Sequence, residues 1–597
     1  MKILLSLLTS IIAVQLGATT YYTCATNGQI TTNPDGTTGC SASTAWNASG
    51  NELIVRAGTT FSATANNQIL TIVNGATLTV VGTLDFGIQN NCEIIVASGG
   101  TLNVNPTGLL SNVGANANSL ITVNSGGIAA FKGSVTCSGA ITINSNNVTI
   151  ADNAAFNQAL LGSATAITLQ RNFNRAGWHQ INFPVTAASS KTLANLVASG
   201  GLTLTYAALP TATVYVWTTT ATTSSWQLPT SSLPLVNQPL ELYVASVPAA
   251  ISLNVTPAQI NASDLAAAPF IRSIPAPSTT PPGNGIGWTT TVTDGWVKLA
   301  NPFQSFLSSD LLGLSGSLDN AVYVWNGGSS YVTRAGGVGA AQFISPNQSF
   351  FVHCTAAGSY QVPLVARNVN PTTKPNYFKT GNQLILNLNG AGHDINTYIA
   401  ENPSATSGFD GAFDAHYLYP NTNFPTFNSV GIDSTAYSVN QVPDLAGQEI
   451  YLSFFYENDN ENFTISLDQG MASNVNVVVL EDLFTQTLTD LKNYDYSFIS
   501  NKNAPAQRFK IHFSQSTIGV TETENGNDLH VWIKNNQLQF EESADLEGAT
   551  INVYSATGQL ISSGTNANPI FVNQTGVYVV HVLTKKGRVY ISKVAKL

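Results

Sequence analysis

The stretch ILTIVNGATLTVVGTLDF, residues 69–86, alternates apolar and polar residues on both sides of a Gly-containing turn. Three similar stretches follow it: CEIIVASGGTLNVNPTGLL (92–110), SLITVNSGGIAAFKGSV (119–135) and AITINSNNVTIADNAAF (140–156). Such alternation predicts short strands that are buried on one face. The turn residues Gly75, Gly99, Gly126 and Asn146 are 24, 27 and 20 residues apart, a period typical of stacked coils. We therefore predict an all-β chain with β-solenoid-like repeats over residues 50–165.

The predicted solenoid carries few charged residues. Its only basic residues are Arg56 and Lys132. A polysaccharide lyase or hydrolase needs acids and bases gathered on one face, whereas Asp85, Glu93 and Asp152 are scattered. This pattern favours a structural spacer or adhesive stalk over a catalytic solenoid.

A second repeat follows the solenoid. The motif GWHQINFPVT, from Gly177, leads to VYVWTTTATTSSW and LVNQPLELYVA, and GWVKLANPFQSF, from Gly295, leads to VYVWNGGSSYVT and SPNQSFFVHC. These apolar alternations, bounded by Gly, Pro and Asn, predict strands. We therefore expect two β-sandwich modules, at 166–273 and 288–375, separated by a Pro/Gly linker at 274–287.

Four tryptophans occur at matching places in the two copies. They are Trp178 and Trp217 in the first copy and Trp296 and Trp325 in the second. Aromatic faces stack on sugar rings, so a carbohydrate platform is one interpretation. Their repetition favours the other interpretation, in which each ring fills the core of its own module.

Residues 376–518 form a third region of alternating strands, for which we predict a β-sandwich. Within it, the acidic piece ENDNENF is expected at a hairpin tip. Its Asp459 and Glu461 could hold calcium, as could Asp410 and Asp414, but neither pair has the spacing of an EF-hand loop. The sequence therefore leaves calcium binding as the weaker alternative to no cofactor at all.

The N-terminus resembles a secretory signal peptide. Met1 and Lys2 precede the apolar run ILLSLLTSIIAVQLG, which predicts a signal peptide at 1–18. In the following leader, at 19–49, an oxidising compartment would favour a disulfide between Cys24 and Cys40. The other cysteines, namely Cys92, Cys137 and Cys354, are expected to be buried and unpaired.

The composition excludes one class of partner. Only 9% of the 597 residues are charged, and the net charge of -10 with a pI near 5.1 offers no basic face for phosphates. We therefore expect no nucleic-acid partner. No second long apolar run follows the N-terminal one, so a soluble mature chain is expected.

The last 79 residues, 519–597, contain the strands TINVYSA, QLISS, GVYVVHVLTKKG and VYISKVAKL. This pattern resembles the type A C-terminal sorting domain of the type IX secretion system, a small β-sandwich. The duplicated GW module and the third region also resemble β-sandwich regions of surface proteins that carry this domain. The residues that carry the sorting-domain resemblance are Gly558, Gly576, Tyr578, Gly587, Lys593 and Lys596.

The resemblance implies a route and a destination. The chain would pass through the periplasm, its sorting domain would be recognised by the outer-membrane translocon, and the passenger would be secreted or attached to the cell surface. The translocon is thus the expected partner, together with extracellular polysaccharide or other copies of the chain.

Standard catalytic signatures are missing from the sequence. It contains no HExxH, no GxSxG and no glycine-rich phosphate loop. His353 and Cys354 are neighbours on a predicted strand, so they point to opposite faces and cannot act as a pair. His179, His416 and His512 are expected at strand edges.

We therefore expect a structural or adhesive surface protein with no catalytic residues. The alternatives are an extracellular carbohydrate-binding or polysaccharide-degrading protein, whose catalytic acids would be brought together from distant positions, and a module that binds a host protein through an exposed apolar patch.

Overall fold

The computed structural model describes most of the chain. The described residues are 19–25, 29–42, 51–57, 59–62, 69–85, 92–111, 120–136, 141–151, 154–156, 161–162, 166–186, 189–206, 212–219, 224–236, 238–260, 271–274, 295–328, 330–340, 342–368, 383–420, 424–432, 434–446, 448–468, 477–514, 531–534, 536–540, 546–555, 558–565, 570–573, 576–585 and 589–596. The predicted signal peptide, most of the predicted linker, Cys137 and Asp152 lie outside these residues.

The structure confirms the all-β fold class, with 54% strand and 3% helix. Its one α-helix in the described ranges is the single turn α1 (Pro257–Ile260). No helix among the described residues is long and apolar enough to span a membrane. The chain divides into two compact units: residues 1–380 with 410–424, and residues 381–409 with 425–597.

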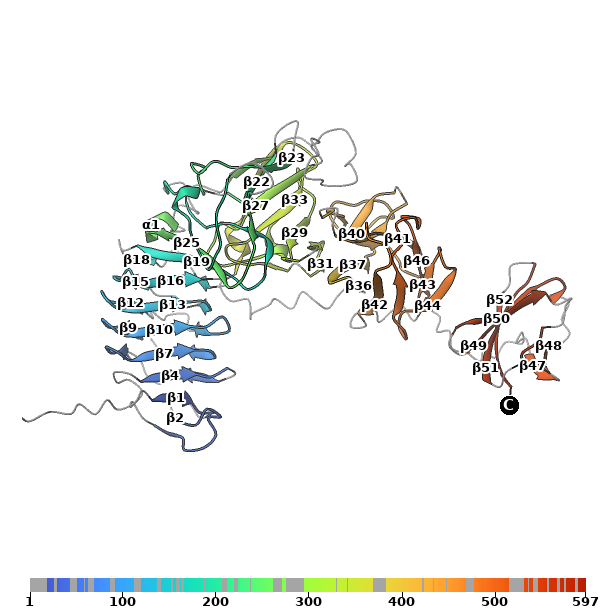
Figure 1. The fold of residues 1–597 in the computed structure, drawn as a ribbon, viewed down its shortest axis with the longest axis horizontal. Coiled ribbons are helices and arrows are strands. Elements are labelled where there is room, and N and C mark those ends of the chain that lie inside the picture. Colours follow the sequence, from blue (N-terminus) through green and yellow to red (C-terminus); the bar gives the residue numbers. More distant parts are fainter. Residues whose placement is uncertain are drawn as a thin grey trace, which may run out of the picture. The chain divides into compact units, whose positions relative to one another are not determined.

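The N-terminal region is a three-faced stack of parallel strands, which Figure 1 shows rising from blue to cyan. The first face consists of β1 (Thr20–Thr23), β4 (Glu52–Val55), β7 (Thr77–Val80), β10 (Thr101–Val104), β13 (Ile128–Phe131), β16 (Val148–Ala151) and β19 (Ile167–Phe173). The second consists of β5 (Thr60–Ser62), β8 (Thr83–Asp85), β11 (Leu109–Ser111), β14 (Ser134–Val135) and β17 (Ala155–Phe156). The third consists of β6 (Ile69–Ile72), β9 (Glu93–Val96), β12 (Leu120–Val123), β15 (Ile141–Ile143) and β18 (Leu161–Gly162). The stack extends beyond 50–165 at both ends, because β1 lies in the leader and β19 follows residue 165.

The core of the solenoid is built from columns of apolar side chains. Leu78, Leu102 and Ala129 occupy the same register position on adjacent strands and are almost completely buried. Residues next to them point outward, as strand alternation requires. Each coil therefore covers the apolar face of its neighbour, which a single coil could not do alone.

Two columns of glycine allow the coils to stack closely. In the first column, the predicted turn residues Gly75, Gly99 and Gly126 have φ values of 77°, 75° and 80°, a conformation that glycine adopts without strain. The second column contains Gly108, where a Cβ atom would lie 2.2 Å from the Val80 carbonyl oxygen of the preceding coil. The second column was not identified from the sequence.

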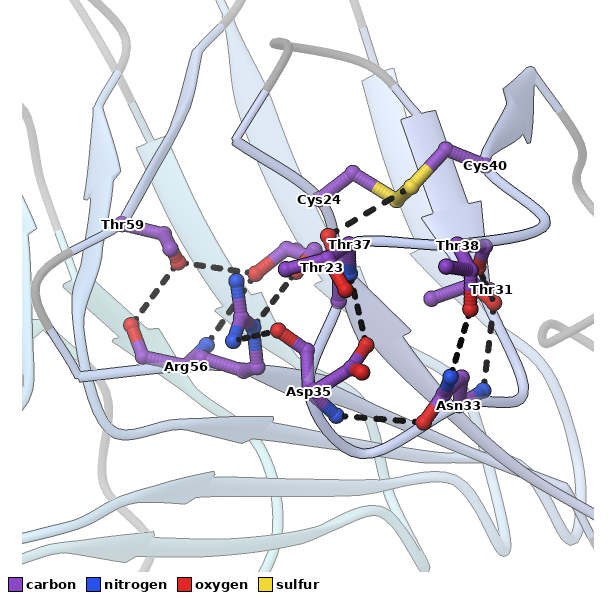
Figure 2. Close-up of a disulfide and its surroundings, with 11 residues drawn as sticks. Thr23, Cys24, Thr31, Asn33, Asp35, Thr37, Thr38, Cys40, Arg56 and Thr59 are labelled. Carbon is purple, nitrogen blue, oxygen red and sulfur yellow. Dashed lines mark hydrogen bonds between the residues drawn. A yellow bond between two sulfur atoms is a disulfide. The ribbon is translucent and has the colours of Figure 1, made fainter.

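The leader closes the N-terminal end of the first solenoid sheet. Its strands β2 (Gln29–Thr31) and β3 (Ser41–Ala42) continue that sheet in antiparallel pairing. Cys24 and Cys40 are joined by a disulfide, with Cα atoms 6.2 Å apart, as Figure 2 shows. The Arg56 guanidinium donates to the carbonyl oxygens of Thr23, at 2.7 Å, and Asp35. The leader is therefore a cap attached to the first coil.

The opposite end of that sheet continues into the duplicated region. Strand β25 (Ala249–Val255) pairs antiparallel with β19, and β21 (Val197–Ser199) pairs with β25. The first module thus shares strands with the solenoid instead of starting as a separate sandwich at residue 166.

The two copies repeat one strand order. The first-copy sheet is β20 (Gly177–Ile181), β24 (Leu240–Val244), β22 (Val214–Thr219) and β23 (Ser224–Gln227). The second is β27 (Trp296–Ala300), β33 (Ser349–His353), β29 (Ala321–Trp325), β30 (Tyr331–Ala335) and β31 (Val338–Gly339). Smaller sheets pair β26 (Ile271–Ile274) with β34 (Gly358–Gln361), and β28 (Phe306–Ser308) with β32 (Phe343–Ile344) and β35 (Arg367–Asn368). In both copies the strand at the GW motif pairs with the strand that follows the NQ dipeptide.

The third region is one long curled sheet. Its strand order is β44 (Thr487–Asp490), β43 (Val477–Asp482), β46 (Phe509–Ser514), β41 (Glu449–Phe455), β39 (Thr426–Val430), β40 (Ala436–Val442), β37 (His393–Glu401), β36 (Gln383–Gly390), β42 (Asn462–Asp468) and β45 (Tyr496–Ile499). The Tyr496 hydroxyl of β45 donates to Asp482 of β43 at 2.7 Å. This bond shows that the two ends of the sheet approach each other around a shared apolar core.

The C-terminal region has a core of its own. Strands β50 (Leu560–Thr565), β49 (Thr550–Ser555), β51 (Gly576–Leu583) and β52 (Val589–Lys596) form one sheet, and β47 (Val531–Lys534) and β48 (Gln537–Phe540) form another. Residues of both sheets, including Val531 and Val580, belong to one buried cluster. This is the arrangement of a small sandwich.

Candidate functional site

The two copies of the module contact each other through reciprocal tryptophan bonds. The Trp217 indole N–H donates to the Trp296 carbonyl oxygen at 3.0 Å, and the Trp325 indole N–H donates to the Trp178 carbonyl oxygen at 2.9 Å. Because Trp217 and Trp325 are equivalent in the repeat, as are Trp178 and Trp296, the joint has approximate two-fold symmetry. Trp217, Trp296 and Trp325 are buried, and Trp178 is half-buried. The first three rings therefore pack inside the protein, but they do so in the joint between the two copies and not each in the core of its own module, as was predicted.

An ion pair is buried in the joint between the copies. Lys298 Nζ of β27 lies 3.1 Å from Glu241 Oε2 of β24, and both side chains are almost inaccessible to water. The ammonium also lies 4.2 Å from the centroid of the Trp226 ring, close enough for a cation–π contact. Burial lowers the pKa of Lys298 to about 8, against the opposing effect of Glu241, and burial likewise raises the pKa of Glu241. Desolvation therefore outweighs the attraction between the two charges.

A second polar cluster lies in the second copy. His353 Nδ1 of β33 is 2.5 Å from Asp319 Oδ2, and His416 Nε2 of β38 (Ala415–His416) is 3.8 Å from the same oxygen. The two imidazole rings have centroids 4.6 Å apart. Asp319 and His353 are buried and His416 is half-buried. The sequence drew attention to both histidines but not to Asp319, because no local motif connects an aspartate to histidines so far along the chain.

The other histidine and cysteine positions are occupied by packing and surface contacts. Cys92 and Cys354 are buried, as predicted, and neither is part of a disulfide. His179 is half-buried beside Phe173, and burial lowers the pKa of its imidazole. His512 lies between Glu481 Oε2, at 2.8 Å from Nε2, and Glu449 Oε1, at 3.3 Å from Nδ1. Its two carboxylate partners thus lie on opposite edges of the ring.

Three of the four predicted calcium residues, namely Asp410, Asp414 and Asp459, have carboxylates that accept hydrogen bonds from backbone N–H groups. The Asp414 carboxylate accepts from the Asp410 N–H at 2.8 Å, and Asp410 accepts from the Ala412 N–H at 3.1 Å. Asp459 accepts from the Lys502 N–H at 2.6 Å and lies 3.8 Å from its ammonium. Among the described residues, only Asp319, His353 and His416 bring three metal-ligand atoms within 4.8 Å of one another.

The sorting-domain residues have different environments. Tyr578 is buried, Lys593 is exposed, and the Lys596 ammonium donates to the carbonyl oxygens of Val572, at 3.0 Å, and Asn573, at 2.8 Å. The remaining three are glycines: Gly558 and Gly576 have φ values of 82° and 153°, and Gly587 lies outside the described residues.

Two surface cavities of the described regions are lined by charged or aromatic side chains. One, of about 450 Å³, is lined by Asp310 and Arg334, whose carboxylate and guanidinium form two hydrogen bonds of 2.6 and 2.7 Å. The other, of about 520 Å³, is lined by Phe484, Tyr496 and Arg508 together with several Ser and Asn residues.

Comparison with known proteins adds no family to this description. No protein-family model matches the chain, and a search of curated proteins finds no match. The functional interpretation therefore depends on the residues and their geometry.

Proposed function

We propose that this chain is a secreted or cell-surface structural or adhesive protein in which the solenoid is a stalk. The observation that carries the proposal is the closure of the first solenoid sheet at both ends, by β2 and β3 on one side and by β25 on the other. Capping strands keep a repeat stack soluble and prevent open-ended edge pairing. A capped stack is suited to carrying the duplicated modules without polymerising through its edges.

The outward chemistry of the stack supports an adhesive role. Thr77 and Thr101 are adjacent in one column, and Thr122 and Thr142 are adjacent in another, all of them partly exposed. Hydroxyl groups both donate and accept hydrogen bonds, so such columns can contact polysaccharide hydroxyls. The test is to mix the full chain with a panel of extracellular polysaccharides and to follow binding and polymer length. Binding with constant polymer length is expected, and progressive shortening would overturn the structural role.

We propose further that residues 519–597 direct export through the type IX secretion system to the outside of the outer membrane. The separate core of the C-terminal sheets supports this role, because a sorting signal must fold independently of its passenger. The test is expression in a bacterium that has this secretion system, with and without 519–597. The truncated chain should accumulate in the periplasm, and secretion of both chains alike would refute the proposal.

A matched pair of lysines sharpens the export test. Lys593 on β52 and Lys534 on β47 are both exposed. Lys593→Ala should slow export if the basic last strand is recognised, while Lys534→Ala should not. Equal export of the two variants would show that Lys593 is not part of the export signal.

A carbohydrate-binding role is the second candidate, and the 520 Å³ cavity favours it. Phe484 is 48% exposed at its rim, and Arg508 lies 4.5 Å from the Phe498 ring centroid while paired to Asp482 at 2.8 Å. An exposed ring beside fixed polar groups is a common arrangement in ligand sites. Phe484→Ala should abolish sugar binding if this cavity is the site, with Phe455→Ala, an exposed ring elsewhere on the same sheet, as the control.

A further inference from the structure

The cluster of Asp319, His353 and His416 has the donor atoms of a transition-metal site. Two imidazole nitrogens and one carboxylate oxygen lie within 4.8 Å of one another. Zinc and related ions bind this combination with bonds of about 2.0–2.2 Å, which separates neighbouring ligand atoms by roughly 3.3 Å. The distance of 3.8 Å between His416 Nε2 and Asp319 Oδ2 needs little change. The distance of 2.5 Å between His353 and Asp319 would widen as an ion replaced the hydrogen-bonded proton.

The charge around the cluster is also suited to a cation. The Asp319 carboxylate is buried, and so is the carboxylate of Asp414, two residues before His416. Buried charges are stabilised by pairing or by coordinating a metal, and a divalent ion would offset both.

Comparison of the two copies shows which part of the role of His353 is packing and which part could be metal binding. His353 pairs across the sheet with Trp296, and the equivalent pair in the first copy is Tyr243 with Trp178. The ring centroids are 5.1 Å apart in the His353 pair and 5.0 Å apart in the Tyr243 pair. The ring contact with tryptophan is therefore made by a 39% exposed tyrosine in the first copy and by a buried imidazole in the second, and the imidazole brings a donor nitrogen that this contact does not require.

The third donor comes from a segment inserted between two parts of the other unit. Residues 410–424 pack with the second copy, although the chain before and after them belongs to the second unit. Asn320 donates from its backbone N–H to the Gly411 carbonyl oxygen at 2.7 Å, and from its side chain to the Ala412 carbonyl oxygen at 3.1 Å. The Phe424 ring lies 5.9 Å from the Trp325 ring. Asp414, Ala415 and Leu418 of this segment are buried, and a ligand bond to His416 would add to the contacts that already hold it.

We propose that Asp319, His353 and His416 bind one divalent transition-metal ion, and that the ion fastens segment 410–424 to the second module. The inference is independent of the proposed adhesive function. The small solvent exposure of the three side chains, between 4% and 17%, is typical of a structural site.

The test uses the full chain, freed of metal with a chelator and titrated with zinc chloride in a calorimeter. Wild type should bind one zinc ion per chain with release of protons, because metal binding requires deprotonated ligands. His353→Tyr, which restores the residue of the first copy, and His416→Gln should each weaken binding at least about tenfold. His512→Gln is the matched control, since its carboxylate partners lie on opposite edges of its ring, and it should bind as wild type does.

Limited proteolysis is a second measurement, and it tests whether the ion attaches segment 410–424 to the second module. Zinc should slow proteolysis within 410–424 in wild type and in His512→Gln, but not in His353→Tyr or His416→Gln. Melting temperatures without metal establish that the variants fold. Absence of zinc binding by wild type, or wild-type affinity in both ligand variants, would overturn the proposal.

Discussion

The solenoid and the duplicated module are both made of strands, but they are stabilised differently. In the solenoid, each coil repeats the same contacts with the next, through apolar columns such as Leu78 and Leu102 and through the close approach at Gly108. In the module, two copies meet once, through single contacts such as the Lys298–Glu241 pair. The comparison teaches that a repeated contact distributes stability along the chain, whereas a single buried contact concentrates it.

The largest effect is expected from breaking the buried ion pair. Lys298→Ala leaves Glu241 charged and unpaired in the joint, which should lower the free energy of unfolding by about 3–5 kcal/mol. The double variant Lys298→Met/Glu241→Leu should recover most of this loss, because apolar residues of similar size remove both desolvation costs. Urea unfolding followed by tryptophan fluorescence measures both. A double variant no more stable than Lys298→Ala would contradict this explanation, because it would show that removing both charges does not restore the stability of the joint.

The cap of the solenoid should give the next largest effect. Cys24 and Cys40 are 16 residues apart in sequence, and a disulfide closing a loop of that size contributes about 3 kcal/mol. Cys24→Ser should therefore lower the free energy of unfolding of the leader, while the module keeps its own. Hydrogen exchange of the leader and solenoid amides measures this. Faster exchange in the module as well would contradict the view that contacts in the solenoid act locally.

The same ion pair predicts a dependence on alkaline pH. The pKa of Lys298 is about 8 in the folded chain, against an ordinary value of 10.5. Between these values the unfolded chain holds a proton that the folded chain has released, so stability rises with pH across this window. The rise should be on the order of 3 kcal/mol relative to Lys298→Met/Glu241→Leu. Parallel pH profiles for the two chains would refute it.

The smallest effect tests the close stacking of coils. Gly108→Ala places a Cβ atom 2.2 Å from the Val80 carbonyl oxygen, and such overpacking costs about 1–3 kcal/mol. Gly408→Ala is the control, since its Cβ atom would meet nothing within 4 Å, and it should change stability little. Thermal unfolding distinguishes them, and equal melting temperatures would mean that the coils can separate to accept a side chain.

The same difference explains what could be predicted from the sequence. The solenoid repeats every 20 to 27 residues, so its strands and the turns at Gly75, Gly99 and Gly126 were visible as a pattern. The duplication was visible too, through its matched tryptophans. The second glycine column was overlooked because its constraint comes from a carbonyl oxygen of the neighbouring coil, which no local pattern reports.

The contacts within the module were beyond sequence reasoning. Lys298 and Glu241 are separated by 57 residues, and nothing in the alternation of β24 or β27 distinguishes a buried charge from an exposed one. Asp319 was missed for the same reason, since its histidine partners come from two later strands. The addition of β25 to the solenoid sheet was also hidden, because the sequence of a strand does not show which sheet it enters.

The central claim is that the outward face of the solenoid makes the adhesive contacts. The most direct measurement is adhesion of the purified full chain to polysaccharide-coated surfaces, comparing wild type with Thr101→Lys/Thr142→Lys, which alters two faces of the stack. Ser407→Lys, an exposed position in the other unit, is the control. Adhesion should fall in the solenoid variant and persist in Ser407→Lys, with polymer length constant throughout. Undiminished adhesion by the solenoid variant would contradict the claim.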